Sequence, residues 1–330
     1  MCTAAACTAG DLYFGRTLDY DCAYGEEVVI TPRGYALDFG GPAPLKSRWA
    51  MIGMAHVAAQ TPGGPAWPLY YEAANEKGLC IAGLNLAASA AYANPLPGRE
   101  NIAPWQLIPW LLGQCASLAE ARGPLARLNL IDAPFSPALP TARLHWLIAD
   151  KTGAVVLEST AAGLKLYENP VGVLTNEPPF DQQLTLLAGY RQLTAGPPET
   201  RFAPGLTLPE YSRGMGAIGL PGDLSSPSRF ARAAFVKLNS VWGETEQDKV
   251  GQFFHILGAV EQPRGCCRLE NGSQEITLYT CCCNAGRGVY YYTTYGNRQI
   301  TAVDMHRADL DGPALTRYAP VAGEQIRWQN

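Results

Sequence analysis

The chain begins MCTAAACTAG (1–10), with a cysteine directly behind the initiator methionine and small residues after it. Met1 is usually trimmed when the second side chain is small, and trimming would leave Cys2 with a thiol and a free α-amino group. Because a neutral α-amino group can accept the thiol proton, one residue would then supply both nucleophile and base. Such a residue suits acyl transfer through a thioester. The alternative is a cysteine that only packs.

Length and composition are those of a globular protein. The chain has 330 residues, 47% of them hydrophobic and 16% charged, with a net charge of −4. This balance favours a folded chain with a large core. There is no Lys/Arg-rich run, which argues against binding to nucleic acid or to an anionic membrane. Neither a signal peptide nor a membrane span is evident, so we predict a soluble, cytoplasmic protein.

Ten cysteines need an explanation. Without a secretion signal, buried reduced thiols are expected rather than a disulfide framework. A zinc site needs spacings such as C-x₂-C, and the sequence has no such pair. The thiols of Cys281–Cys283 would alternate between the faces of a strand and cannot converge on one metal. A non-catalytic, thiol-rich metal or redox module is therefore a remote alternative, and we predict no metal and no cofactor.

Hydrophobic periodicity divides the chain into blocks of strands and blocks of helices. Strands are expected at 11–20 and 26–35, and we expect these two to pair with each other. A further strand is expected at 78–86, and several strands each within 143–178 and 274–307, with a hairpin turn at 295–297. Helices are expected at 101–128, interrupted at Pro109 and Gly123–Pro124, and at 180–193, 228–242 and 248–260. We expect an upstream serine to cap the helix at 228–242.

Grouping of this kind favours α+β layering over a parallel βαβ sheet. The segment 194–214 is rich in Pro, Gly and Thr but is flanked by well-patterned elements. We therefore predict that it is a long surface loop rather than a linker. No internal repeat is evident, and we expect one domain over residues 1–330.

Arg16 lies on the otherwise apolar face of the strand pattern FGRTLDY (14–20). A buried arginine needs an anionic partner, because an unpaired buried charge is costly. A thiolate at Cys2 or the carboxylate of Asp19 could be that partner, although Asp19 reaches the same site only across a bulge or a strand end. The alternative is an ordinary structural Arg–Asp pair.

Three further polar residues stand at the ends of predicted elements. Asn176 lies between an apolar strand and a proline turn, where its amide could donate to an oxyanion. Asn85 ends the strand at 78–86, and for both asparagines turn geometry is the alternative. Arg229 opens a helix, a place where a cation calls for an anionic partner unless it is solvated.

Other catalytic patterns are missing from the sequence. His145 lies in an apolar run and is expected to be a core histidine, as is His255. No H-E-x-x-H, G-x-S-x-G, P-loop or G-x-G-x-x-G fingerprint occurs in a supporting context. These absences argue against the commoner hydrolase and nucleotide-binding classes.

The chain resembles the choloylglycine hydrolase family, which comprises bile salt hydrolases and penicillin V acylases. The resemblance runs nearly end to end and rests on segments in order: MCT (1–3), YFGRTLDY (13–20), YGEEVVITPRGY (24–35), NEKGLCIAGLN (75–85), VGVLTNEPPFDQQL (171–184), GLPGDLSSPSRFARAAF (219–235), QFFHILGAVEQPRGCC (252–267) and GVYYYTTYGNRQITAVDMHR (288–307). It implies an N-terminal-nucleophile hydrolase of αββα fold, with two stacked antiparallel sheets between helix layers. It also implies that removal of Met1 exposes Cys2 as the nucleophile, with its α-amino group as base.

The same resemblance implies roles for the other site residues. Arg16 and Asp19 would orient the Cys2 thiol and amine. Asn176 would donate to the oxyanion, and the main-chain N–H at Asn85 would provide a second donor. Arg229 would maintain the charge balance of the site.

The resemblance implies substrates that are amides of an acyl group with glycine, taurine or 6-aminopenicillanic acid. Bile salt hydrolases typically carry Asn at the position of Asn85, which favours conjugated bile salts. Penicillin V acylase or N-acyl-homoserine lactone acylase activity by the same chemistry is the alternative. The family is usually tetrameric, so we expect a homotetramer.

The family's substrate loops correspond to residues 20–24 and 55–65. Tyr20 and Tyr24 could form amphipathic walls for a substrate ring. The sequence departs from the family at two places: Tyr20 replaces an expected aliphatic residue, and LAASAAY (86–92) replaces a more polar stretch. Both departures concern which substrate side chain is preferred rather than the chemistry.

Overall fold

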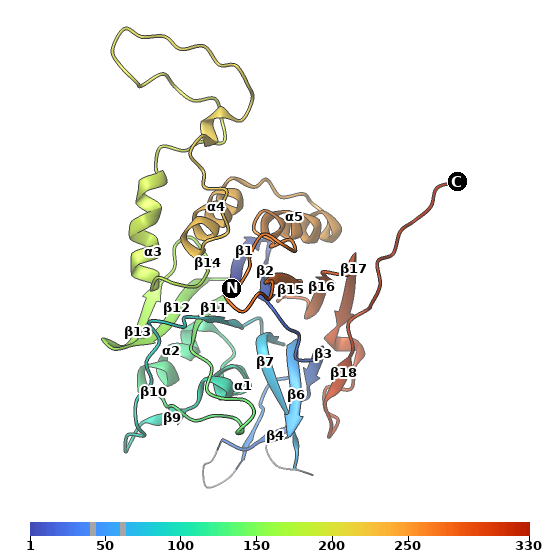
Figure 1. Cartoon of the computed structure of the whole chain (residues 1–330). Helices are drawn as coiled ribbons and strands as arrows, with labels where there is room; N and C mark the ends of the chain where they lie inside the picture. Colours follow the sequence, from blue (N-terminus) through green and yellow to red (C-terminus); the bar gives the residue numbers. More distant parts are fainter. Residues whose placement is uncertain (40–43, 60–63) are drawn as a thin grey trace.

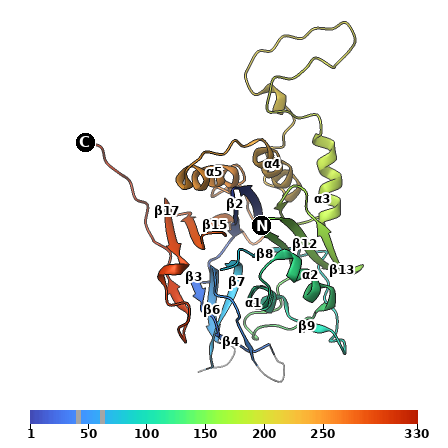
Figure 2. The ribbon, with the colours of Figure 1, turned by 180° about the vertical axis from the view of Figure 1, so that it is seen from behind.

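The computed structural model describes residues 1–39, 44–59 and 64–330. Two large antiparallel β-sheets lie face to face, and helices cover the outer surface of each (Figure 1). The view from behind shows the same layers (Figure 2). The α+β, four-layer αββα architecture predicted above is therefore confirmed. In the described ranges, no helix is long and apolar enough to cross a membrane.

The first sheet joins the two ends of the chain. It has six strands, in the spatial order β14 (Val173–Leu174), β1 (Cys2–Ala9), β2 (Asp11–Tyr20), β15 (Ile276–Asn284), β16 (Val289–Thr294) and β17 (Asn297–Asp304). The hairpin predicted at the end of the chain is confirmed, because β16 and β17 are antiparallel partners with a two-residue connection.

The second sheet has eight strands. Their spatial order is β13 (Gly163–Glu168), β12 (Gly153–Thr160), β11 (Leu144–Asp150), β8 (Cys80–Asn85), β7 (Ala66–Asn75), β6 (Met51–Ala59), β3 (Glu26–Thr31) and β18 (Thr316–Tyr318). The predicted meander corresponds to β11, β12 and β13. Two small sheets complete the strands: β4 (Ala36–Leu37) with β5 (Leu45–Lys46), and β9 (Glu100–Ile102) with β10 (Leu128–Leu130).

Five α-helices form the outer layers of the described chain. They are α1 (Leu107–Gln114), α2 (Leu118–Arg127), α3 (Phe180–Leu187), α4 (Ser226–Asn239) and α5 (Glu246–Gly258). Helices α4 and α5 lie against β1 of the first sheet, whereas α1 lies against β7 and β8 of the second (Figure 1). Short 3₁₀ turns are η1 (Pro104–Gln106), η2 (Ala188–Tyr190), η3 (Met215–Ala217) and η4 (Met305–Arg307).

Small side chains explain the position of β1 at the centre of the molecule. Ala4 and Ala5 are fully buried. β1 contacts α4 and α5 as well as β8 of the second sheet, so elements approach it from both faces. Alanine permits this approach where a β-branched residue would not fit, and packing thus overrides the weak strand propensity of alanine. The start of the chain is thereby held in the interior.

Two sequence predictions, one about strand pairing and one about helix breaks, are wrong. The strand at 11–20 does not pair with that at 26–35, because β2 lies between β1 and β15 while β3 lies between β6 and β18 in the other sheet. The helical stretch at 101–128 breaks at 115–117, not at its prolines. Pro109 sits in the first turn of α1, where a missing N–H costs little. Ser117 caps α2 by accepting from Glu120 N at 3.2 Å.

The segment between α3 and α4 projects away from the body of the molecule (Figure 1). Between η2 and η3 it contains no helix or strand, which confirms the surface loop predicted at 194–214. Ser225 occupies the N-cap position of α4, but its side chain makes no capping hydrogen bond there. Instead Asp223 accepts from Ser225 N and Ser228 Oγ at the start of the helix.

Candidate active site

Cys2 is the first residue of β1 and pairs with Leu18 of β2. It is only 2% exposed, yet it borders a cavity of about 500 Å³ that lies between the two sheets. Arg16 and Asn85 border the same cavity. Three residues that are far apart in sequence therefore meet where the first sheet faces the second.

Asn176 and Arg229 hold the backbone of Cys2 directly. The Cys2 N–H donates to Asn176 Oδ1 at 2.7 Å, and Arg229 Nη1 donates to the Cys2 carbonyl oxygen. Arg229 Nη2 donates to the same Asn176 Oδ1 at 2.8 Å, and its Nη1 also donates to Thr3 Oγ1 at 2.7 Å. A closed set of hydrogen bonds thus fixes the nitrogen that would become the α-amino group once Met1 is removed.

Asn85 contributes through its main chain. The N–H of Leu144, opposite Asn85 on β11, donates to Tyr92 Oη. Leu86 N donates to the carbonyl oxygen of Arg143, the residue just before β11. The alternation of an antiparallel ladder therefore turns the N–H and C=O of Asn85 away from β11. The Asn85 carbonyl accepts from Asn176 Nδ2 at 2.8 Å, which places both asparagines beside Cys2.

Asp19 lies on the helix-facing side of β2. Its carboxylate accepts hydrogen bonds from Thr277 Oγ1 at 2.6 Å and Thr17 Oγ1 at 3.1 Å, and Arg229 Nη1 lies 4.0 Å from its Oδ2. Burial raises the pKa of Asp19, and Arg229 and the Thr277 hydroxyl oppose that rise. Burial also lowers the pKa of Arg229, with Asp19 as the main opposing charge. The two groups form one buried ion pair.

Arg16 points to the opposite side, toward the second sheet. It is 1% exposed, and its Nη1 donates to the carbonyl oxygens of Gly83 and Tyr71. The carboxylate nearest to it is Glu72, with Nε 3.8 Å from Oε2. Of the two anionic partners considered for Arg16, Asp19 pairs instead with Arg229. The reason is that odd and even positions of β2 face opposite sides of the sheet.

The register of β2 against β15 shifts between Thr277 and Tyr279. This irregularity lies opposite Leu18 and Asp19. On the strand pattern of the sequence, Arg16 and Asp19 can both reach one site only if a bulge or a strand end lies between them. Cys2 pairs with Leu18 at the same level. Arg16 and Asp19 thus project to opposite sides of β2, the strand that pairs with β1 at Cys2.

Met1 is held by Asp19 and Glu275. Its ammonium group donates to the carbonyl oxygen of Asp19 at 2.7 Å and pairs with Glu275 Oε1. Burial raises the pKa of Glu275, and the Met1 ammonium opposes that rise. While Met1 is attached, the nitrogen of Cys2 is a peptide N–H and has no lone pair available as a base.

The cavity wall is largely apolar. Tyr20 and Tyr24 border it with ring centroids 5.8 Å apart. Further apolar lining comes from Leu18, Leu69, Ile108, Phe135, Leu139 and Trp146. Of the second predicted loop, 55–65, His56 borders the cavity, and residues 60–63 lie outside the described residues. Such a wall suits a large apolar acyl group.

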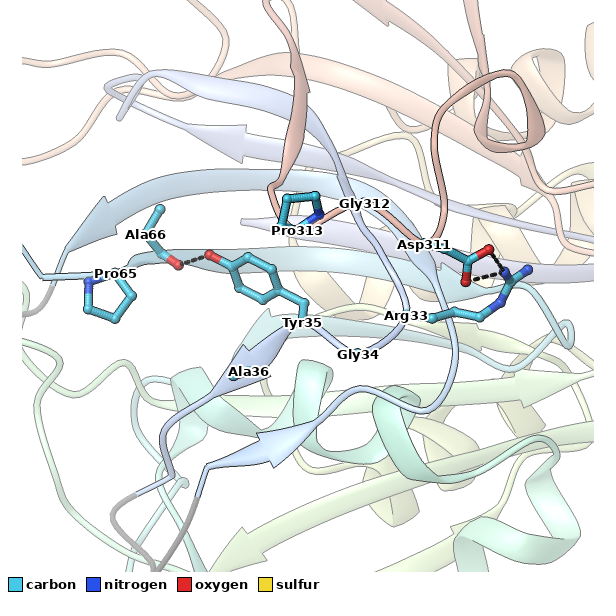
Figure 3. Close-up of a pocket in the computed structure, with 9 residues that line it drawn as sticks. All are labelled: Arg33, Gly34, Tyr35, Ala36, Pro65, Ala66, Asp311, Gly312 and Pro313. Carbon is cyan, nitrogen blue, oxygen red and sulfur yellow. Dashed lines mark hydrogen bonds and ion pairs between the residues drawn. The ribbon is translucent and has the colours of Figure 1, made fainter.

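A second hollow, of about 570 Å³, lies near the other end of the second sheet and shares no lining residue with the first. Figure 3 shows Arg33 paired with Asp311 and Tyr35 directed at the carbonyl of Ala66. Arg33 is also bonded to Glu76 on its other side. These polar groups satisfy one another, and none of the described residues that line the hollow is a cysteine, serine, threonine or lysine.

All ten cysteines are free thiols. Seven are buried, and burial raises the pKa of Cys7 and Cys283 to about 12, so neither is a thiolate near neutral pH. His145 is fully buried between Glu158 Oε1 and the Thr175 carbonyl, which confirms it as a core histidine.

Four site residues escaped the sequence analysis. Glu72 approaches Arg16, Thr3 accepts from Arg229, Ser226 Oγ accepts from Asn176 N at 2.8 Å, and Gln183 Nε2 donates to the Asn176 carbonyl. Glu72 alone left a signal: it is a carboxylate within the apolar run LYYEAA (69–74), which indicates a buried partner.

Comparison with known proteins gives a consistent result. The relatives include a bile salt hydrolase/transferase of Lactiplantibacillus plantarum, 50% identical over 96% of both chains, and one of Clostridium perfringens, 33% identical over 96% of both. A variant of the conjugated bile acid hydrolase from Clostridium perfringens superposes over the full length of both chains, with a TM-score of 0.90 and 32% identity.

A penicillin V acylase from Agrobacterium tumefaciens shares the fold, with a TM-score of 0.75, 18% identity and coverage of 98% of this chain and 92% of its own. The model of the linear amide C–N hydrolases, choloylglycine hydrolase family, matches residues 2–318. The match begins at Cys2, one of the residues that line the cavity. The chain therefore belongs to the choloylglycine hydrolase family of linear amide C–N hydrolases.

Proposed function

We propose that this protein hydrolyses the amide bond of glycine- and taurine-conjugated bile salts through a thioester on Cys2. The observation that carries the proposal is the position of Cys2, whose nitrogen lies 2.7 Å from Asn176 Oδ1 at the wall of a large, mostly apolar cavity. The names of the relatives support the substrate class. The cavity supports it as well, because a steroid acyl group is large and apolar.

In the proposed mechanism, hydrolysis of the Met1–Cys2 peptide bond first frees the Cys2 amine. The amine takes the thiol proton, and the sulfur attacks the carbonyl carbon of the substrate amide. The free hydrogen of Asn176 Nδ2 and the N–H of Asn85 would donate to the oxyanion, a type of contact worth roughly 3–4 kcal/mol in the transition state. The conjugated amine leaves with the proton from the Cys2 ammonium, and water then hydrolyses the thioester.

Charges around Cys2 support this sequence of steps. Two buried arginines, Arg16 and Arg229, lie near the thiol, and Asp19 offsets the second of them. Arg143 is exposed at the same cavity and would offer a cationic partner to the carboxylate or sulfonate of the conjugate. We further propose a cytoplasmic, single-domain enzyme, for which ten free thiols are the support.

The test is amine release from purified, reduced enzyme, with glycocholate, taurocholate and penicillin V assayed side by side. We expect faster release of glycine or taurine than of 6-aminopenicillanic acid. Cys2→Ala should abolish turnover, and Cys2→Ser should retain little, because an alcohol is far harder to deprotonate. Cys266→Ala, which removes an exposed thiol outside the cavity lining, is the matched control and should remain active.

Intact mass would show whether Met1 has been removed from the active sample. Dominant release of 6-aminopenicillanic acid would keep the mechanism and replace the substrate. Turnover by Cys2→Ala near the wild-type rate would exclude the thioester mechanism.

A further inference from the structure

Glu72 on β7 is a buried carboxylate for which the proposed mechanism has no use. Both of its oxygens accept hydrogen bonds from tyrosines: Tyr290 Oη lies 2.6 Å from Oε1, and Tyr279 Oη lies 2.7 Å from Oε2. The two tyrosines belong to β16 and β15 of the first sheet, whereas Glu72 belongs to the second. The carboxylate is therefore anchored across the space between the sheets.

The cation nearest to this carboxylate is Arg16. Arg16 Nε donates to the carbonyl oxygen of Thr17 at 3.3 Å and lies 3.8 Å from Glu72 Oε2, while Nη1 is bonded to two further carbonyl oxygens. Arg16 Nη2 has no hydrogen-bond acceptor among the residues that the structure places, and the side chain borders the cavity beside Cys2. The arginine is thus held at Nε and Nη1 and leaves Nη2 for the site.

The charges of this group depend on one another. Burial disfavours a charged guanidinium, but the neighbouring acidic groups, Cys2 and Glu72 among them, outweigh this effect and raise the pKa of Arg16. Burial raises the pKa of Glu72, while Arg16 and the two tyrosine hydroxyls oppose that rise. An arginine stem has four rotatable bonds, so its charged end needs fixed partners to keep one orientation.

We propose that Glu72 is a positioning residue, which holds the guanidinium of Arg16 in the orientation that directs Nη2 at Cys2. The two tyrosines position Glu72 in turn. This role rests on the proposed function, in which Cys2 is the nucleophile. Loss of the Glu72 charge would let the guanidinium turn away from the site, and the chemistry at Cys2 would slow although every catalytic residue is still present.

The variant that tests the proposal is Glu72→Gln, which keeps the shape of the side chain and removes its charge. We expect kcat to fall by about tenfold or more, with KM within about twofold, because the defect lies at the reacting sulfur. The pH at which iodoacetamide alkylates Cys2 at half its maximal rate should rise. Tyr279→Phe and Tyr290→Phe should produce smaller changes in the same direction.

A double-variant comparison tests whether Glu72 acts through Arg16. We expect Arg16→Met combined with Glu72→Gln to be no slower than Arg16→Met alone. The double variant also removes the unpaired carboxylate that would destabilise the single one. Additive losses would mean that Glu72 acts independently of Arg16, and this would overturn the proposal. Where Arg16→Met alone does not fold, the graded tyrosine variants decide the question.

Two variants control for general damage to the fold. Glu76→Gln breaks another carboxylate–arginine pair, with Arg33, outside the cavity. Tyr13→Phe removes another tyrosine hydroxyl that donates to a carboxylate, that of Glu246. Both should leave kcat and the alkylation profile unchanged.

Two outcomes for Glu72→Gln would overturn the positioning role. Lower thermal stability with an unchanged alkylation profile would show that Glu72 is only structural. A shift of alkylation to lower pH would show that Glu72 merely weakens the field of Arg16. The alkylation readout needs no substrate, so it tests Glu72 even if wild-type enzyme releases no amine, a result that would instead refute the proposed function.

Discussion

At the scale of single residues, Asn176 uses both ends of its amide. Its oxygen accepts from Cys2 N and Arg229 Nη2, and its nitrogen donates to the Asn85 carbonyl. The orientation of the amide is therefore determined by its neighbours, because the opposite orientation would set donors against donors. One hydrogen of Nδ2 is left for an oxyanion, as the proposed mechanism requires.

Asn176→Asp keeps this shape but replaces the donating nitrogen with an oxygen. We expect kcat to fall by about 10²–10³-fold, because the oxyanion would lose a donor and meet a negative charge instead. Some stability should be lost, because the new oxygen meets the Asn85 carbonyl. The variant should still fold, since the carboxylate accepts from Cys2 N and lies beside Arg229. The measurement is the rate of glycine release from glycocholate, with the unfolding temperature recorded on the same samples.

The matched control is Asn169→Asp. Asn169 also donates to a carbonyl, that of Val173, and accepts from two backbone N–H groups, but it does not border the cavity. It should lose stability while keeping its kcat. Equal kcat losses in both variants would argue that Asn176 serves the fold rather than the reaction.

The sequence allowed most of these residues to be singled out but not their pairing. Cys2, Asn85, Asn176 and Arg229 stand at element ends, where polar side chains are conspicuous, and the structure links them by hydrogen bonds. Their partners could not be inferred, because a carboxylate such as Glu72 meets Arg16 only after two sheets have stacked.

At the scale of elements, Asp150 joins the end of β11 to the start of α2. Asp150 Oδ2 accepts from Leu118 N at 2.8 Å, and Oδ1 accepts from Thr152 N at 2.7 Å. Burial disfavours the charged carboxylate, but the hydrogen bonds from Thr152 and Leu118 outweigh it and lower the pKa of Asp150 from its ordinary value. The charge therefore stabilises the docking of α2 on the second sheet.

Asp150→Asn should reduce the free energy of unfolding at pH 7 by about 1–3 kcal/mol, the usual contribution of hydrogen bonds to a charged group. Because the pKa of Asp150 is lower in the folded state, its stabilisation is complete above the ordinary value of 3.8 and is lost as pH falls through the folded value. The difference in the free energy of unfolding between wild type and variant should therefore become smaller below about pH 3.8. Urea unfolding at pH 7 and pH 3 measures it.

The exposed Asp132 provides the control, and Asp132→Asn should change little at either pH. If the stability difference between wild type and Asp150→Asn grew larger in acid, Asp150 could not be the ionised, stabilising carboxylate described above.

Element positions were more predictable than element partners. The hairpin of β16 and β17 is closed by a local turn, and local sequence encodes it. The pairing of β2 with β15 joins residues more than 250 positions apart, and periodicity identifies a strand without naming its neighbour. For the same reason the expected pairing of β2 with β3 failed.

At the scale of the whole molecule, the segment between η2 and η3 extends beyond the two-sheet body (Figure 1). It carries large apolar side chains in solvent: Phe202 is 85% exposed and Tyr211 is 83% exposed. Aromatic side chains at such exposure are typical of surfaces that become buried by association. We propose that the projection reaches a second copy of the chain in the homotetramer that the family resemblance implies.

We therefore expect wild-type enzyme to show about four times the chain mass of 35.5 kDa by light scattering after size-exclusion chromatography. Phe202→Ser combined with Tyr211→Ser should lower this mass, because the interface would lose the apolar area that drives association. Val241→Ser is the control, since Val241 is 87% exposed but lies between α4 and α5, outside the projection. A monomeric wild-type enzyme, or a double variant of unchanged mass, would exclude this mode of assembly. A double variant that forms a smaller species and still hydrolyses substrate would show that each chain carries a complete active site.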